Sequence, residues 1–180
     1  MINKRQKMKK VILSLVFCSF AISGMGQVLI GKEPKISQSY ESVLMDFYDE
    51  TDNIRGIILP AVDGLANLSE SNNGTFLFDK TDSKIKMYQN NTWVELSDEG
   101  SGISIIENTS SEADKGVVIG AETSPATGVL VLEDSTKALV LPKINKPEET
   151  VNSPYVGMMC YDTASKSVAI FDGTVWNYLK

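Results

Sequence analysis

The sequence predicts an all-β fold: two tandem modules, each ending in a three-stranded antiparallel meander, behind an N-terminal signal peptide. Two segments, 73–96 and 156–179, carry the same residue pattern without a gap. Asp79 then aligns with Asp162 and Trp93 with Trp176, 83 positions apart in both pairs. Short stretches of alternating polarity, separated by turn-forming residues, favour strands over helices in both copies.

The first 26 residues have the composition of an export signal. They hold five basic residues and no acid: Lys4, Arg5, Lys7, Lys9 and Lys10. The apolar run 11–22 that follows is short for a permanent membrane anchor, and Gly24 and Gly26 supply the small residues that precede a cleavage site. We expect cleavage before Gln27 and no membrane insertion afterwards; a retained segment is the alternative.

Two cysteines bear on anchoring and redox chemistry. Cys18 follows Phe17 inside the apolar run, whereas a lipid-attachment motif needs a small residue before a cysteine at the end of that run. A lipid anchor is therefore the less favoured alternative. The mature chain retains only Cys160, so it forms no intrachain disulfide, and we expect Cys160 to be a small core residue.

We divide the chain into a signal peptide (1–26), a first module (27–97), a linker that can hold one short strand (98–116) and a second module (117–180). Each module is expected to begin with short apolar strands of matching sequence. These pairs are 28–30 with 117–119, 43–45 with 129–131, and 57–59 with 139–141, at offsets of 89, 86 and 82. The offsets differ, so the loops vary in length.

The repeated block predicts three short strands joined by tight turns. In the first copy, 84–87 alternates two lysines with Ile85 and Met87, which predicts one apolar and one solvated face. In the second copy, Val168 and Ile170 are expected inside, with Ser167 and Ala169 outside. The Asp-Gly pair at 172–173 predicts a hairpin turn, because such turns need a positive φ.

Composition excludes several function classes. The formal net charge is −6, and removal of the five basic residues of the signal leaves −11. An acidic body argues against nucleic acid as a partner. The chain has no histidine, which excludes Ser-His-Asp catalysis and histidine-based zinc sites. We therefore expect a non-enzymatic protein with no cofactor, metal site or catalytic residue.

Four aromatic residues are the candidate ligand-binding positions: Trp93, Trp176, Tyr88 and Phe171. Exposed rings of this kind can stack on the apolar face of a sugar. The favoured alternative is that they close the core of each meander.

Two hydroxyl residues are candidates for O-glycosylation. Thr163 lies in Asp-Thr-Ala and Ser135 in Asp-Ser-Thr, which resemble a short acceptor pattern of Bacteroidetes proteins. The alternative is that both are ordinary turn residues.

The order of these blocks resembles a repeat of secreted Bacteroidetes proteins and of phage-type fibre stems. The Gln-Val-Leu-Ile-Gly opening at 27–31 matches that repeat. So do Gly-Met-Met-Cys-Tyr-Asp-Thr at 157–163, Phe-Asp-Gly at 171–173, and Trp176. One family glycine is Leu29 here. The resemblance implies a structural or adhesive role, at the surface of a Gram-negative cell or on an extracellular appendage, with the periplasm as the alternative.

Self-association is the expected partnership, and a trimer is favoured because the similar fibre stems are trimeric. A physical argument points the same way: the stretch 128–132 is apolar at successive positions and needs cover on both faces. Small modules also bury little surface alone. A surface glycan or another cell-envelope protein is a further possible partner, and a carbohydrate-binding module is the alternative function.

We predict that Gln27 begins the exported chain. Intact-mass and N-terminal peptide mass spectrometry of the secreted protein check this. An uncleaved N-terminus, or a lipid on Cys18, contradicts it.

Overall fold

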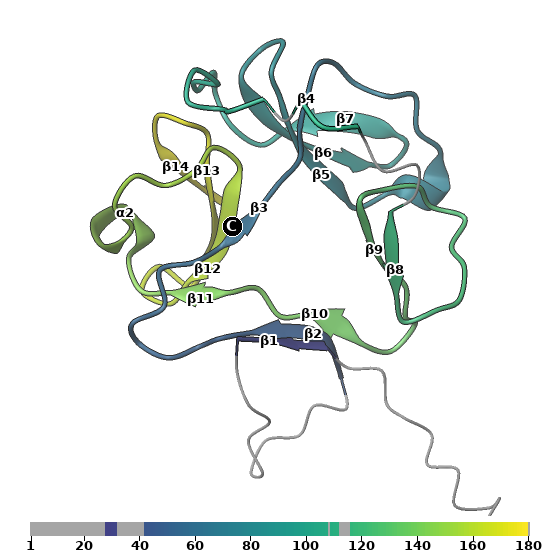
Figure 1. Ribbon diagram of the computed structural model, residues 1–180, viewed down its shortest axis with the longest axis horizontal. Coiled ribbons are helices and arrows are strands. Elements are labelled where there is room, and N and C mark those ends of the chain that lie inside the picture. Colours follow the sequence, from purple (N-terminus) through teal and green to yellow (C-terminus); the bar gives the residue numbers. More distant parts are fainter. Residues whose placement is uncertain (1–27, 32–41, 108, 112–115, 180) are drawn as a thin grey trace, which may run out of the picture.

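The computed structural model describes residues 28–31, 42–107, 109–111 and 116–179. The signal segment, Cys18 and Gln27 lie outside these residues. In the described part, the fold is all β apart from one short α-helix and one 3-10 turn (Figure 1). The elements of the first repeat are β1 (Val28–Ile30), β2 (Val43–Phe47), β3 (Ile57–Ile58), β4 (Ala61–Val62), η1 (Glu70–Asn72), β5 (Thr75–Asp79), β6 (Lys84–Gln89) and β7 (Thr92–Glu95). Those of the second are β8 (Val117–Ile119), β9 (Leu130–Leu132), β10 (Ala138–Leu139), β11 (Lys143–Ile144), α2 (Pro147–Thr150), β12 (Met158–Asp162), β13 (Ser167–Phe171) and β14 (Trp176–Leu179).

The two meanders are confirmed, with the same register in both repeats. Phe76 pairs with Met87 between β5 and β6, and Met159 pairs with Ile170 between β12 and β13. The backbone hydrogen bond from Gly74 N to Tyr88 O recurs, at the same 2.8 Å, between Gly157 N and Phe171 O. The gapless alignment of the two blocks therefore holds strand by strand.

The strands before each meander also repeat. β1 lies parallel to β2, as β8 does to β9, and β4 lies parallel to β5, as β11 does to β12. One sequence offset was wrong. Val28 pairs with Met45 and Val117 with Leu130, so β2 and β9 correspond at an offset of 85 and not 86. The run of similar apolar residues did not fix the alignment to within one position.

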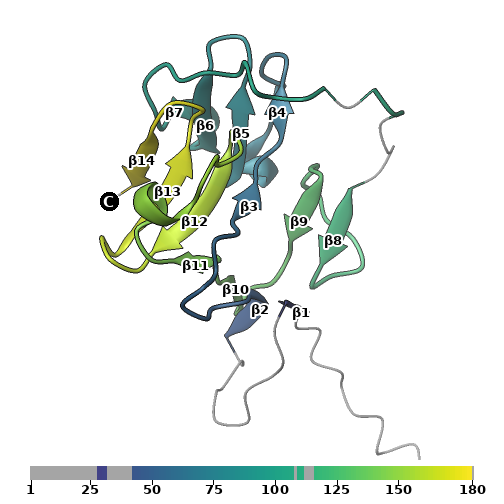
Figure 2. The same cartoon turned by 60° about the vertical axis from the view of Figure 1, so that its left-hand side comes forward.

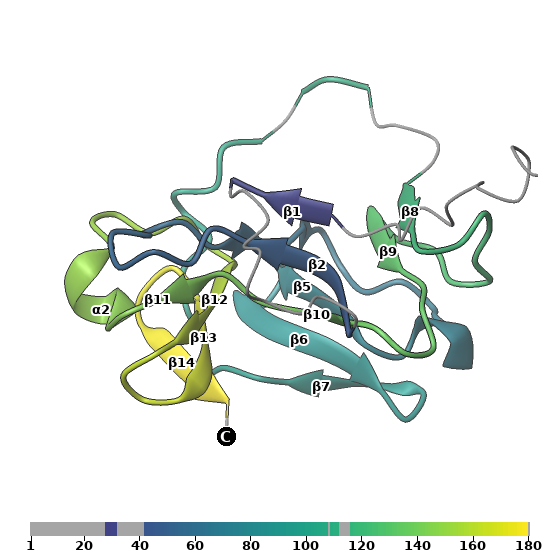
Figure 3. The ribbon, with the colours of Figure 1, turned by 90° about the horizontal axis from the view of Figure 1, so that it is seen from below.

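The two repeats exchange their third strands. β3 of the first repeat pairs antiparallel with β12 of the second, with Ile57 opposite Met159. β10 of the second repeat pairs parallel with β2 of the first, with Leu139 opposite Met45. Figure 3 shows β1, β2 and β10 side by side as one three-stranded sheet. Backbone hydrogen bonds therefore join the modules in both directions.

A hydrophobic core is shared between the meanders. Phe78 and Ile85 of the first meander pack with Met159 and Ile170 of the second, and Leu59 completes the contact. Figure 2 shows the two meanders side by side, with β3 beside β12. Three short strands bury little surface alone, so each meander provides the cover that the other needs.

A second core covers the other face of β12 and β13. It consists of Ile144, Met158, Cys160 and Ala169, with Val151 and Trp176 packed against them. The prediction that Ser167 and Ala169 face solvent was therefore wrong: both are buried. The segment that begins at α2 covers a face that the strand pattern alone left open.

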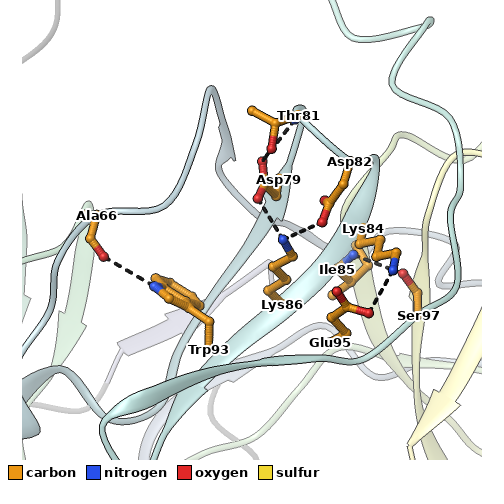
Figure 4. Close-up of polar contacts among 10 residues, drawn as sticks. All are labelled: Ala66, Asp79, Thr81, Asp82, Lys84, Ile85, Lys86, Trp93, Glu95 and Ser97. Carbon is orange, nitrogen blue, oxygen red and sulfur yellow. Dashed lines mark hydrogen bonds and ion pairs between the residues drawn. The ribbon is translucent and has the colours of Figure 1, made fainter.

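The prediction of a solvated face on β6 was wrong at Lys86, whereas Lys84 is partly exposed. Lys86 is buried, and its Nζ lies 2.8 Å from Asp79 Oδ2 and 2.5 Å from Asp82 Oδ2. Burial opposes the charge of Lys86, but the hydrogen bonds to Asp79 and Asp82 outweigh it and raise its pKa. The lysine is accommodated because two carboxylates compensate its charge (Figure 4).

The linker lies across both meanders. Gly100 N donates to Ser83 O at 2.8 Å, and Ser101 N donates to Asp172 O at 2.9 Å. A Cβ added at Gly173 would overlap the Ser101 carbonyl, so the close approach requires a glycine there. The short strand predicted for this linker does not form at 103–106, and residues 103–104 lie in a turn.

Asp162→Ala is expected to lower the free energy of unfolding by about 1–3 kcal/mol, the cost of leaving buried donors without a partner. Asp162 is buried and accepts hydrogen bonds from the backbone N–H groups of Lys146, Ala164 and Ser165 at 2.9, 2.9 and 3.0 Å. Urea denaturation checks this, with the exposed Asp98→Ala as control. Equal stability of the two variants contradicts the prediction.

The same carboxylate makes stability depend on pH. Burial acts to raise the pKa of Asp162, but the hydrogen bonds from Ser165, Ala164 and Lys146 outweigh it and lower the pKa. The stabilisation is therefore present above the ordinary aspartate pKa, about 4, and is lost as pH falls through the lower folded value. Asp162→Ala should consequently cost less stability in acid than at neutral pH.

Candidate assembly site

The strand pair β8–β9 carries apolar residues that nothing in the described chain covers. In each strand the first residue is exposed and the other two are partly exposed, so no residue of the pair is buried. The contrast with β2 is large: Leu44 and Met45 are 2% and 4% exposed, whereas their counterparts Val129 and Leu130 are 72% and 45% exposed. Exposed aliphatic residues grouped on one strand indicate a contact surface.

This strand pair nevertheless has a fixed position. Asn72 of η1 is buried, and its Nδ2 donates to the backbone oxygen of Thr127 at 3.1 Å. A Cβ added at Gly120 would lie 3.2 Å from Cδ1 of Leu44, so the end of β8 contacts the sheet of β2. In Figure 2 the pair lies beside the body formed by the meanders. The exposed apolar side chains of β8 and β9 therefore lie on strands that contact the rest of the fold.

The run 128–132 is predicted from sequence to need cover but is not among the predicted site residues. The available signal was the absence of alternation: Leu130, Val131 and Leu132 are all apolar, and no charge interrupts them. An exposed β3 residue, Ile58, was also missed, since a two-residue strand has no readable period. The run 128–132 and Ile58 are recognised as candidate site residues from their exposure in the structure.

The four candidate aromatic residues form two equivalent ring pairs. Tyr88 and Trp93 meet edge to face with centroids 5.2 Å apart, and Phe171 and Trp176 are tilted at 5.6 Å. Trp93 Nε1 donates to the Ala66 carbonyl at 3.2 Å (Figure 4). Tyr88 is buried and the other three rings are half-buried. The pairs thus pack at the rim of each meander, and their sugar-binding role stays a prediction.

The two glycosylation candidates lie in turns of different exposure. Ser135 is exposed, between Asp134 and Thr136. Thr163 is half-buried, and its N–H donates to Ile144 O at 2.9 Å. The backbone N–H and hydroxyl of Thr136 lower the pKa of Asp134 to about 2, so this carboxylate holds the turn around Ser135. Modification at either position stays a prediction.

Cys160 has the environment of a packing residue. It is buried, and burial raises the pKa of its thiol to about 12, so the reactive thiolate is not populated at neutral pH.

Within the described ranges, no group of three or more acidic or cysteine side chains is arranged to hold a metal ion. Across those same residues, no helix has the length and apolarity to cross a membrane.

Residues 118–180 match the family model of the phage tail like trimerisation region. The match begins within β8 and extends through β14, so it covers the second repeat and includes the exposed strand pair. Neither the curated proteins nor the solved structures contain a match.

Trp176→Ala is expected to lower the free energy of unfolding by about 1–3 kcal/mol, less than the roughly 3–5 kcal/mol typical of a fully buried Trp. The ring is half-buried and contacts both Phe171 and the second core. Urea denaturation checks this, with Trp93→Ala as the matched variant in the first meander. Losses below about 0.5 kcal/mol in both variants are typical of surface positions and would contradict a packing role.

Proposed function

We propose that this chain is a non-enzymatic structural protein that acts as a homotrimer, in the manner of a fibre stem. The observation that carries the proposal is the coincidence of two features on the second repeat. The trimerisation-region match covers 118–180, and the apolar strand pair β8–β9 lies uncovered in the same segment.

The physical case rests on the cost of exposed apolar surface. Burial contributes about 25 cal/mol per Å² of apolar area, so a chain that leaves Val117, Val129 and Leu130 in water gains from covering them. Burial of the equivalent residues of β2 shows that such a sheet can be covered in this fold. A second copy of the chain is the occupant that a trimerising protein provides.

Location and adhesion are further parts of the proposal. The basic and apolar N-terminal pattern supports export, and the resemblance to secreted Bacteroidetes repeats favours the surface of a Gram-negative cell or an extracellular appendage. The non-enzymatic assignment is supported by the absence of histidine from the sequence and by the inert environment of Cys160.

Carbohydrate binding is the second candidate function. The observation that favours it is that Trp93 and Trp176 are only half-buried at the rims of the meanders, so part of each ring is accessible. Loss of binding to soluble glycans in both tryptophan variants, with folding retained, supports this role. Unchanged binding in both variants eliminates it.

The mature protein is expected to have three times the mass of a single chain in solution. Size-exclusion chromatography with light scattering, and native mass spectrometry, measure this at micromolar concentration. Because the exposed residues of β8–β9 are apolar, moderate salt should not dissociate the trimer, unlike an interface of surface ion pairs. A stable monomer contradicts the proposal.

A further inference from the structure

We propose that the outer edge of β9 receives β3 of a second copy as a parallel strand. The inference rests on the proposed trimer and specifies which elements build its interface. It assigns one surface to each side: the edge of β9 that faces away from β8, and the edge of β3 that faces away from β12.

The first repeat shows the arrangement that the second one lacks. Its sheet has the order β1-β2-β10, so β2 is paired on both edges. Val140 N donates to Met45 O at 2.9 Å, and Ala138 N donates to Ser42 O at 2.9 Å. The corresponding sheet of the second repeat contains only β8 and β9 among the described strands. The counterpart of Met45, Leu130, therefore lies on a strand that no third strand of the described residues adjoins.

A third strand beside β9 would take the place that β10 takes beside β2. The counterpart of β10 in the first repeat is β3, at a sequence offset of 82. β3 uses one edge to pair with β12: Ile57 lies opposite Met159, and Leu59 N donates to Gly157 O at 3.0 Å. Backbone groups alternate in direction along a strand, so the N–H and C=O of Ile58 point to the other edge. Ile58 corresponds to Val140, the residue that donates to Met45.

Both partners of the proposed contact are exposed and uncharged. Ile58 and Leu130 are 46% and 45% exposed. Natural sheets protect open edges with lysine, proline or a bulge, and none of these occurs in Leu130–Leu132. By contrast, β7, the outer strand of the first meander, carries Glu95 in an ion pair with Lys84. The edge of β9 has the composition of an edge that becomes paired.

The geometry makes the contact heterologous, because the edge of β3 and the edge of β9 are different surfaces. Each copy then donates one strand and accepts one, and such contacts form a closed ring when the rotation between copies allows it. Three copies related in this way use every β3 edge and every β9 edge. In the resulting sheet, β8 and β9 of one copy continue into β3, β12, β13 and β14 of the next.

The first test places a charge on each edge. Leu130→Lys and Ile58→Lys should each abolish the trimer peak in light scattering at a concentration where the mature protein is fully trimeric. Val175→Lys is the matched control, since Val175 is an exposed aliphatic residue outside both edges. Circular dichroism and thermal melting establish that each variant folds. If both edge variants remain as trimeric as the control, the inference is wrong and the trimer itself stands.

The second test detects the contact directly and does not depend on disrupting it. Ile58→Cys and Leu130→Cys single variants are mixed, reassembled and treated with a short bis-maleimide; Cys160 is buried and gives little background. A cross-link that joins peptides of the two variants, and that is absent when Val175→Cys replaces Leu130→Cys, supports the inference. Absence of the cross-link in a verified trimer overturns it.

The double variant Ile58→Cys/Leu130→Cys distinguishes contacts between chains from contacts within one. A cross-linked ladder ending at three chains is expected. An intrachain cross-link in a monomer at high dilution shows that β9 receives its own β3, which overturns the inference. A mature protein that is monomeric before any substitution overturns the proposed function as well.

Discussion

The core between the two meanders is the contact on which the rest of the fold depends. Phe78 and Ile85 belong to one repeat, Met159 and Ile170 to the other, and all four are buried in one shared cluster. A three-stranded meander is marginal alone, so the duplication provides the second layer that stability requires. The exchange of β3 and β10 between the repeats adds backbone pairing to this packing, and the linker is held against both meanders through Ser83 and Asp172.

Exchange makes the repeats unequal, although their strands match in order. β2 receives β10 and its central residues are buried, whereas β9 pairs on one edge within the described part of the chain and has no buried residue. β12 likewise receives β3, whereas β5 pairs with β4 and β6 and has no equivalent third partner among the described strands. The equivalent strands β2 and β9 therefore have different places in their sheets: β2 is central, whereas β9 belongs to a two-stranded sheet. The two repeats therefore differ in which strands are paired on both edges, although their strands match in order.

Short-range pattern was enough to predict the meanders, their turns and the equivalence of Trp93 and Trp176, because alternation and turn residues act over a few positions. It did not predict where Lys86 and Ala169 would lie. Lys86 is buried because Asp79 and Asp82 compensate its charge, and Ala169 because the segment around Val151 covers it. Nor could it predict the exchange of β3 and β10, since strands of two residues do not encode a partner. The exposure of Leu130 depends on that exchange, so the sequence pattern could not predict it either.

The candidate site is a strand edge and not a pocket. Catalysis and metal binding need several polar groups directed at one point, whereas buried Asp162 holds a turn and buried Asp79 compensates the charge of Lys86. Among the described strands, the open edges of β9 and β3 carry the exposed residues Leu130 and Ile58. Edge pairing is directional and fixes register through side-chain alternation, because a slip of one residue would turn apolar side chains to the opposite face. An assembly built on it gains a defined orientation between copies, which a structural repeat protein requires and a general apolar patch would not supply.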